Sequence, residues 1–302
     1  MNINEIKHSG HRFGDIEFLT KQVVEGFITG LHQSPYHGFS VEFAEHRQYN
    51  TSESTRHIDW KVYAKSDRLF VKKYEEETNL RCTILLDVSS SMYYPEDKLT
   101  KLKFSILSAS TIAHLLQKQR DAVGLVAFDE EIILHTPVKS TSKHLHELML
   151  QMHRLFDKKS INHKTKVYNV LNTIAEKIHK RSLVILFSDM FEDMLQTDEL
   201  LNALKHLKHM QHEVIVFHVK DKNTELEFEF EDRPTMFVDI ETGEKIKVNP
   251  AQIKKSYKES LLKFSNEIKL KCGNFKIDYI EIDANQDFKQ VLMPFLIKRS
   301  KM

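Results

Sequence analysis

The chain has 302 residues, of which 41% are apolar and 29% are charged, and its formal net charge is +1. This balance is typical of a globular protein with one large or two ordinary domains, and it excludes a chain that is mainly disordered. The near-zero charge argues against a generally basic nucleic-acid binder, because such a protein needs a cationic surface to engage many phosphates.

The cysteines and the apolar stretches indicate the compartment. The two cysteines, Cys82 and Cys272, form neither a C-x-x-C pair nor a disulfide framework, which is typical of reduced thiols. Residues 1–10 lack the apolar stretch of a signal peptide, and no window approaches the roughly eighteen consecutive apolar residues of a membrane helix. We therefore expect a cytoplasmic protein that does not insert directly into a membrane.

Residues 1–80 are expected to form an N-terminal extension that packs on the core, because no linker separates them from the rest of the chain. Apolar positions at helical spacing predict an amphipathic helix over residues 19–31. Further along, Arg47, Arg56 and Asp59 allow two interpretations. We favour an internal ion-pair lattice, and the alternative is a surface on which the two arginines meet a partner.

From residue 81 the pattern predicts a doubly wound α/β fold. Helical stretches separate the apolar runs, and such continuous runs are typical of parallel strands covered on both faces. Residues 81–302 are therefore predicted to form a mostly parallel sheet flanked by helices. The runs expected as its first strands are 82–86, 122–128, 132–135, 183–187 and 214–219.

Helix signals and turn residues complete the prediction. Apolar residues recur at helical spacing from Leu99 to Leu116, and Thr197 is placed to begin another helix. A later helix is expected to begin at Asn249-Pro250 and to end before Gly273. A small β-hairpin with a turn at Thr242-Gly243 is expected as an insertion at about 225–248. A strand over 275–282 and a final helix over 287–297 follow.

Oxygen-bearing side chains follow two of the predicted strands. Asp87-Val88-Ser89-Ser90-Ser91 comes directly after the first strand, and Ser188-Asp189 comes after the strand at 183–187. The carboxyl ends of parallel strands meet at one edge of a sheet, so Asp87 and Asp189 would face one crevice. A carboxylate with hydroxyls and water suits Mg²⁺. The alternative is that Asp87 and Ser89 merely open a turn.

Known enzyme motifs give little support to catalysis. A phosphatase of the haloacid dehalogenase type would need a second Asp two residues after Asp87, where this chain has Ser89. Neither a Gly-x-Ser-x-Gly elbow nor a phosphate loop is present in the sequence. A binding module is therefore preferred. The remaining alternative is a metal-dependent phosphoester hydrolase, in which the same ion polarises a phosphoryl group or activates water.

The sequence also resembles known families. Asp-x-Ser-x-Ser after the first strand and Ser-Asp after a later one resemble the metal-ion-dependent adhesion site of von Willebrand factor A domains. An upstream block is similar to the bacterial domain of unknown function family 58, and the similarity covers roughly residues 10–300. The members of that family join such a block to a von Willebrand factor A-like domain and are often encoded beside MoxR-type AAA ATPases. The matching segments are Gly38-Phe39-Ser40-Val41-Glu42-Phe43, Arg47-Gln48-Tyr49, Arg56-His57-Ile58-Asp59-Trp60-Lys61, Phe70-Val71 and Tyr74-Glu75-Glu76-Glu77.

The resemblance implies a ligand set for Mg²⁺, Mn²⁺ or Ca²⁺. Asp87, Ser89 and Ser91 match the first metal loop and Asp189 matches the last, while Thr165 is the best candidate for the threonine of an intervening loop. Met190 stands where adhesion-type domains frequently have glycine. The competitors of Thr165 are Thr100, Thr111, Thr136 and Thr141.

The ligand types indicate how such a site would work. We expect the hydroxyls of Ser89 and Ser91 to touch the ion directly, and Asp87 and Asp189 to hold it through water or one oxygen each. An ion with few direct carboxylates keeps a position open for an Asp or Glu of a partner protein. The expected function is a metal-dependent protein–protein interaction module. The resemblance implies that it works with a MoxR-type AAA ATPase in a chaperone-like or assembly role.

Overall fold

A computed structural model describes six longer stretches and five short pieces of the chain. The short pieces are 20–21, 24, 46–48, 63–64 and 69–72, and the longer stretches are 80–95, 100–157, 167–190, 197–239, 243–287 and 289–299. The chain divides into two compact units, one of residues 27–79 and one of residues 1–26 with 80–302.

The smaller unit contains an antiparallel strand pair. Its strands are β1 (His46–Gln48) and β2 (Phe70–Lys72). Arg56, Asp59 and the side chain of Arg47 lie outside the described residues. The ion-pair lattice and the partner surface thus both stay open as alternatives. That residues 1–80 pack on the core also stays a prediction.

A sheet of six strands forms the centre of the larger unit, in the order β10-β7-β6-β3-β4-β5. Every neighbouring pair is parallel except β4 and β5, which are antiparallel, so the predicted mostly parallel sheet is confirmed. Only residues 129–131 join β4 to β5, and this connection is too short for the crossover that a parallel pair needs. The strands are β3 (Arg81–Asp87), β4 (Ala122–Phe128), β5 (Ile132–His135), β6 (Leu183–Ser188), β7 (Glu213–Lys220) and β10 (Asp278–Asp283).

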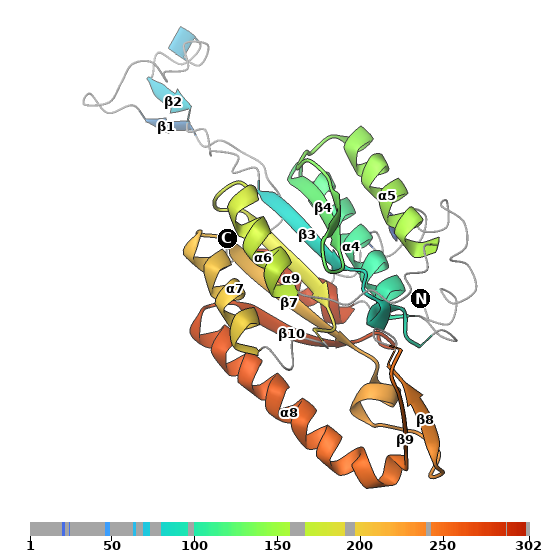
Figure 1. Ribbon diagram of the computed structural model, residues 1–302. Helices are drawn as coiled ribbons and strands as arrows, with labels where there is room; N and C mark the ends of the chain where they lie inside the picture. The colour runs from blue at the N-terminus through green and yellow to red at the C-terminus, as the bar shows by residue number, and fades with distance from the viewer. Residues whose placement is uncertain are drawn as a thin grey trace. The chain divides into compact units, whose positions relative to one another are not determined.

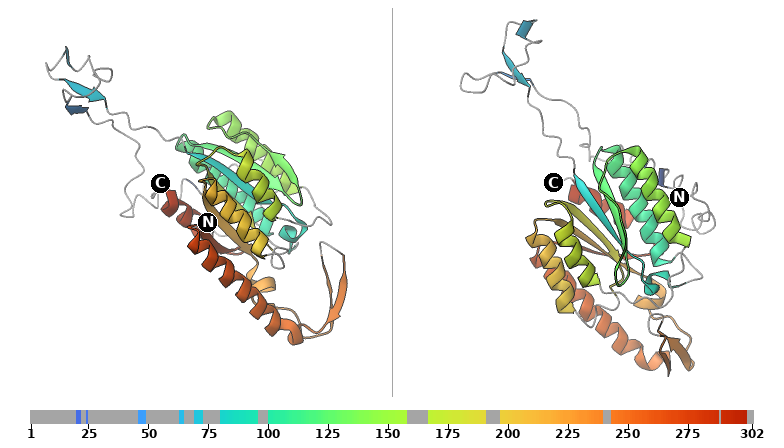
Figure 2. Two further views of the ribbon diagram at one scale, coloured as in Figure 1. Left: turned by 60° about the vertical axis from the view of Figure 1, so that its left-hand side comes forward. Right: turned by 45° about the horizontal axis from the view of Figure 1, so that its top comes forward.

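Helices cover both faces of this sheet (Figures 1 and 2). One face carries α4 (Lys101–Lys118), α5 (Ser142–Asp157) and α9 (Lys289–Arg299). The other face carries α6 (Val167–Lys177), α7 (Thr197–His209) and α8 (Pro250–Asn274). All residues of β6 are buried, as expected for a continuous apolar run between two helical layers. The predicted doubly wound architecture is thus confirmed.

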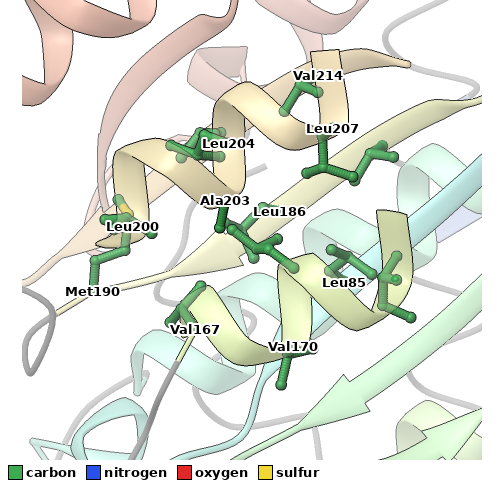
Figure 3. Close-up of a cluster of buried hydrophobic side chains, with 14 of the residues drawn as sticks. Leu85, Val167, Val170, Leu186, Met190, Leu200, Ala203, Leu204, Leu207 and Val214 are labelled. Carbon is green, nitrogen blue, oxygen red and sulfur yellow. The ribbon is translucent and has the colours of Figure 1, made fainter. Parts of the chain in front are cut away.

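The core beneath α6 and α7 shows how helical periodicity meets the pleat of the strands. Val170 of α6 and Leu204 of α7 are almost completely buried, and they pack towards Leu85 of β3 and Leu186 of β6 (Figure 3). Strand residues two apart face the same side, whereas helix residues three or four apart share one face. These two periods place the apolar side chains of both layers against each other.

Helix α8 does not end where the sequence predicts. Asn249 caps its beginning as expected, because the side-chain oxygen accepts a hydrogen bond from the Ala251 N–H at 3.1 Å. Gly273 does not follow the helix but lies in its last turn, which continues to Asn274. Lys276, at φ +56°, is the left-handed residue that ends it, and Ile277 N–H bonds back to the Cys272 carbonyl at 2.9 Å. Backbone hydrogen bonding of the Schellman type sets this end without glycine.

The predicted hairpin is present, with strands that begin later than expected. β8 (Thr235–Val238) and β9 (Lys245–Val248) form a separate antiparallel sheet, and Gly243 in their connection has φ +74°. The segment before them contains a single π-helical turn, η4 (Lys222–Leu226). Among the described helices, none has both the length and the apolar character that a membrane crossing requires.

Candidate cation site at the carboxyl end of the sheet

Asp87 and Asp189 lie at the same edge of the sheet. Asp87 is the last residue of β3, and Asp189 directly follows β6, which pairs with β3 in parallel. The chain proceeds from β3 to β4 on one side, whereas β6, β7 and β10 lie on the other side. Ligands of open α/β sheets bind beyond the strand ends at such a reversal of strand order.

The carboxyl group of Asp87 is fully buried and held by hydrogen bonds. Its Oδ1 accepts from the Ser89 N–H at 3.0 Å, and its Oδ2 accepts from the Ser188 hydroxyl at 2.6 Å. The Ser188 oxygen in turn accepts from the Met190 N–H at 2.9 Å. Asp87 therefore does open a turn, as the structural alternative predicts, and each carboxylate oxygen still has a second lone pair for a ligand.

The hydroxyls of Ser89 and Ser91 lie side by side next to Asp87. The two Oγ atoms are 3.1 Å apart, Ser89 is buried and Ser91 is partly exposed. Neighbouring oxygen ligands of an octahedral Mg²⁺ are about 3 Å apart, because each metal–oxygen distance is about 2.1 Å. The spacing of the two hydroxyls therefore fits a hard divalent cation.

The described surroundings of Asp87 disfavour its charged form. Burial, followed by the negative charge of Asp189, raises the pKa of Asp87 to about 7. Desolvation and a neighbouring like charge both oppose the ionisation of a carboxyl group. A cation between these side chains would offset both effects.

Lys101, which the sequence analysis did not single out, is part of the same cluster. It is the first residue of α4 and only 2% exposed; its Nζ donates to Asp189 Oδ2 at 2.6 Å and to Glu225 Oε1 of η4. Burial alone would lower the pKa of Lys101, but the carboxylates of Asp189 and Glu225 outweigh it and raise the pKa. Its ammonium lies between Asp189 and Glu225, whereas the hydrogen bonds of Asp87 are with Ser89 and Ser188.

Asp189 is thus shared between Lys101 and the candidate site. Among the described residues, the cluster contains the carboxylates of Asp87, Asp189 and Glu225, the ammonium of Lys101 and the hydroxyls of Ser89, Ser91 and Ser188. Burial, which Lys101 opposes, raises the pKa of Glu225 as well. In the described parts of the chain, no group of three or more His, Cys, Asp or Glu residues has a geometry that would hold a metal. An ion here would therefore need hydroxyl and water oxygens in addition to the carboxylates of Asp87 and Asp189.

Thr165 lies outside the described residues, so its place as a ligand stays a prediction. Its competitors all make hydrogen bonds with the backbone: Thr100 and Thr141 accept from Lys103 N–H at 3.1 Å and His144 N–H at 3.3 Å, respectively. The Thr111 hydroxyl donates to the Leu107 carbonyl within α4, and that of Thr136 to the Leu125 carbonyl of β4. Each of these four threonines thus has a structural role.

Met190 adopts the conformation that glycine would favour. Its φ is +49°, and its side chain is buried in the core beneath α7 (Figure 3). The left-handed conformation costs a residue with a side chain roughly 1–2 kcal/mol. The turn after β6 thus has the left-handed backbone conformation that glycine favours, although the residue there is Met190.

Comparisons with known proteins identify relatives of this chain. The profile of a family described as "Protein of unknown function DUF58" matches residues 45–266, well over half of the chain. Uncharacterized proteins of Mycobacterium bovis and Mycobacterium tuberculosis are 22% identical to it over 134 residues. These matches cover 44% of this chain and 42% of each relative, so the chain spans less than half of their length.

Solved structures with a similar arrangement include two from Bacteroides. The conserved hypothetical protein BatB of Bacteroides thetaiotaomicron is 16% identical, with a TM-score of 0.46. An aerotolerance-related membrane protein of Bacteroides fragilis is 17% identical, with a TM-score of 0.45. Each match covers 74% of this chain and 100% of the other.

Proposed function

This chain belongs to the DUF58 family, and we propose that it is a metal-dependent protein–protein interaction module of the von Willebrand factor A-like type. The observation that carries the proposal is the convergence of Asp87, Ser89, Ser91 and Asp189 at one end of the sheet. Two hydroxyl oxygens 3.1 Å apart stand beside a buried carboxyl whose pKa is raised to about 7. This donor set favours Mg²⁺, Mn²⁺ or Ca²⁺ over softer metals.

The side chains have distinct roles in this proposal. The hydroxyls of Ser89 and Ser91 contact the ion, Asp87 and Asp189 hold it through water or one oxygen each, and Thr165 is the candidate from the intervening loop. Lys101 orients Asp189 through the bond of 2.6 Å. When bound, a divalent ion supplies positive charge that an Asp or Glu of a partner protein can meet.

The proposed partner is a MoxR-type AAA ATPase, and the proposed role is chaperone-like or in assembly, in the cytoplasm. The family resemblance supports this partner. An exposed contact between an ion and a carboxylate weakens as salt screens it. Binding of the purified ATPase should therefore require the metal and decrease with ionic strength.

Calorimetric titration of MgCl₂ and MnCl₂ into the purified chain tests the metal site directly. Binding heat is expected for the wild type and a large loss of affinity for Ser89→Ala. Ser256→Ala, at an exposed position of α8, is the matched control and should titrate like the wild type. Absence of binding to the wild type, or equal affinity in Ser89→Ala, would disprove the proposed site.

A metal-dependent phosphoester hydrolase is the second candidate. The convergence of Asp87 and Asp189 at one end of the sheet favours it, because an ion held there would polarise a phosphoryl oxygen or activate water. The test is turnover of 4-nitrophenyl phosphate with Mg²⁺ or Mn²⁺. Activity that Asp87→Ala abolishes would support the hydrolase, whereas metal-dependent binding of a protein without turnover supports the interaction module.

A further inference from the structure

An apolar pocket opens directly beside the candidate cation site. Its volume is about 620 Å³, and Ser91, Lys101 and Glu225 form the end nearest the site. The opposite wall is the β8–β9 hairpin, which lies beyond the carboxyl end of the central sheet (Figure 1). A molecule in this pocket can therefore contact Ser91 and the hairpin at the same time.

Aromatic rings line the interior of the pocket. Phe228 packs against Phe230, Phe237 and Tyr257, with ring centroids 4.9, 5.9 and 4.8 Å apart. These rings come from the segment after η4, from β8 and from α8. Aromatic walls with few polar groups favour a bulky apolar side chain as the occupant.

The hairpin carries apolar side chains at the mouth of the pocket and on its outer surface. Met236, Val238 and Ile246 are 58%, 49% and 60% exposed. Residues opposite each other in an antiparallel pair share one face, so Met236 lies beside Lys247 and Val238 beside Lys245. Phe237 and Ile246 pair on the other face, which carries the ring that packs on Phe228, and the 60% exposed Ile246 extends that apolar face beyond what a small molecule would cover.

We propose that this pocket binds a segment of a partner protein in which an Asp or Glu lies beside a bulky apolar residue. The apolar side chain enters the pocket between Phe237 and Tyr257, and the carboxylate meets the cation next to Ser91. Residues flanking this pair lie along the hairpin face that carries Phe237 and Ile246. The inference rests on the proposed metal-dependent function and adds the chemistry of the segment that is recognised.

The charges inside the pocket distinguish the two ends. Besides Glu225, the lining includes Asp239 and Glu244, which lie near the turn of the hairpin. These carboxylates repel an acidic group at the turn end, whereas Lys101 offsets Glu225 at the Ser91 end, so the carboxylate of the segment is directed to the Ser91 end. A basic segment held by the aromatic rings and these carboxylates is the competing outcome, and peptide selection separates the two.

Selection of randomised short peptides displayed on phage against the full-length chain, with Mg²⁺ present, is the experiment. We expect recovered peptides to be enriched in Asp or Glu within two residues of Phe, Leu, Trp or Met. Recovery of peptides dominated by Arg or Lys, or of no enriched sequence, would overturn the inference. A recovered peptide then serves as the fluorescent probe for affinity measurements.

Two hairpin variants test the pocket itself. Ile246→Asp changes an exposed side chain that lines the pocket, and Phe237→Ser removes a ring from its wall. Each should weaken binding of the peptide by about tenfold or more while Mg²⁺ binding by calorimetry stays unchanged. Leu270→Ser, at an exposed apolar position of α8 outside the pocket, is the matched control.

The outcomes separate this inference from the proposed function. If Mg²⁺ binds the wild type but Ile246→Asp and Phe237→Ser bind the peptide as tightly as the wild type does, the inference fails and the metal site stands. If the peptide binds equally well in EDTA, the apolar pocket stands without its ionic contact, and the inference as stated is wrong. If Mg²⁺ does not bind at all, the proposed function itself fails.

Discussion

Lys101 is a buried cation whose contribution to folding stability depends on its two carboxylate partners. Its Nζ donates to Asp189 and to Glu225, and together these bonds connect α4 with the end of β6 and with η4. Removing one member of a buried ion pair leaves uncompensated charge, which usually costs about 3–5 kcal/mol. Substitution of Lys101 should therefore affect both the folding stability and the binding of a cation.

Lys101→Ala is expected to lower the free energy of unfolding by about 3–5 kcal/mol in EDTA, because Asp189 and Glu225 lose their counter-charge. Mg²⁺ should raise the melting temperature of this variant more than that of the wild type, since the ion replaces the missing positive charge. Lys118→Ala, at the exposed end of α4, is the control for thermal denaturation. Wild-type stability of Lys101→Ala in EDTA would contradict the assigned role.

At Met190, the strain of the left-handed backbone opposes the stability gained by burying the side chain. Glycine would relieve roughly 1–2 kcal/mol of left-handed strain, but truncating a buried methionine costs about 2–5 kcal/mol. Met190→Gly should therefore be less stable than the wild type by about 1–3 kcal/mol in urea denaturation. Met190→Leu, which nearly conserves the volume, should lose less, and a glycine variant more stable than the wild type would refute this balance.

At the scale of elements, the β8–β9 hairpin depends on packing from outside its own sheet. A two-stranded sheet alone is marginally stable in water. Phe237 of β8 and Tyr257 of α8 both pack on Phe228, whose ring thus ties the hairpin to the helix. The hairpin is therefore expected to open locally at a lower free energy than the central sheet.

Tyr257→Ala should accelerate hydrogen exchange in residues 235–248 and leave the exchange of β3 and β6 unchanged, because it removes only the support from α8. Hydrogen exchange followed by mass spectrometry measures both regions at once. Tyr168→Ala, on the partly buried surface of α6, is a control away from the hairpin. Equal acceleration in the central strands would mean that the hairpin and the sheet unfold as one unit.

At the scale of the whole molecule, buried ionisable groups couple folding to pH. His218 of β7 is buried near Lys220 and Lys101, and its Nδ1 is hydrogen-bonded to the Tyr279 hydroxyl. Burial, assisted by the two lysines, holds the pKa of His218 well below its usual value. The unfolded chain takes up a proton near pH 6.5 and the folded chain does not, so this group contributes stability above that pH and loses it as the pH falls.

His218→Gln should therefore lose less stability than the wild type when the pH falls from about 7 to 5. The contribution of one such histidine changes by up to about 1.4 kcal/mol per pH unit. Urea denaturation in EDTA at both pH values measures the difference, and His209→Gln, at an exposed position of α7, is the control. A stability gap between wild type and His218→Gln that stays constant with pH would exclude this linkage.

Sequence reasoning located most elements of the central sheet because burial on both faces leaves a local signal. The expected runs 122–128 and 132–135 coincide with β4 and β5 residue for residue, and the predicted strand at 82–86 lies within β3. The direction of β5 and the true end of α8 leave no such signal in the apolar pattern. They depend on the length of a connection and on backbone hydrogen bonds rather than on hydrophobic pattern.

The sequence by itself determined that a carboxylate and hydroxyls follow one buried strand and that another carboxylate follows a second one, since each pattern is local. Only the tertiary structure decided which charges meet there. Lys101 is 88 residues from Asp189 and 124 from Glu225 along the chain, and at the start of an apolar helix it looks like an ordinary solvated lysine. Its burial follows from the convergence of α4, β6 and η4, and no periodicity encodes contacts over such separations.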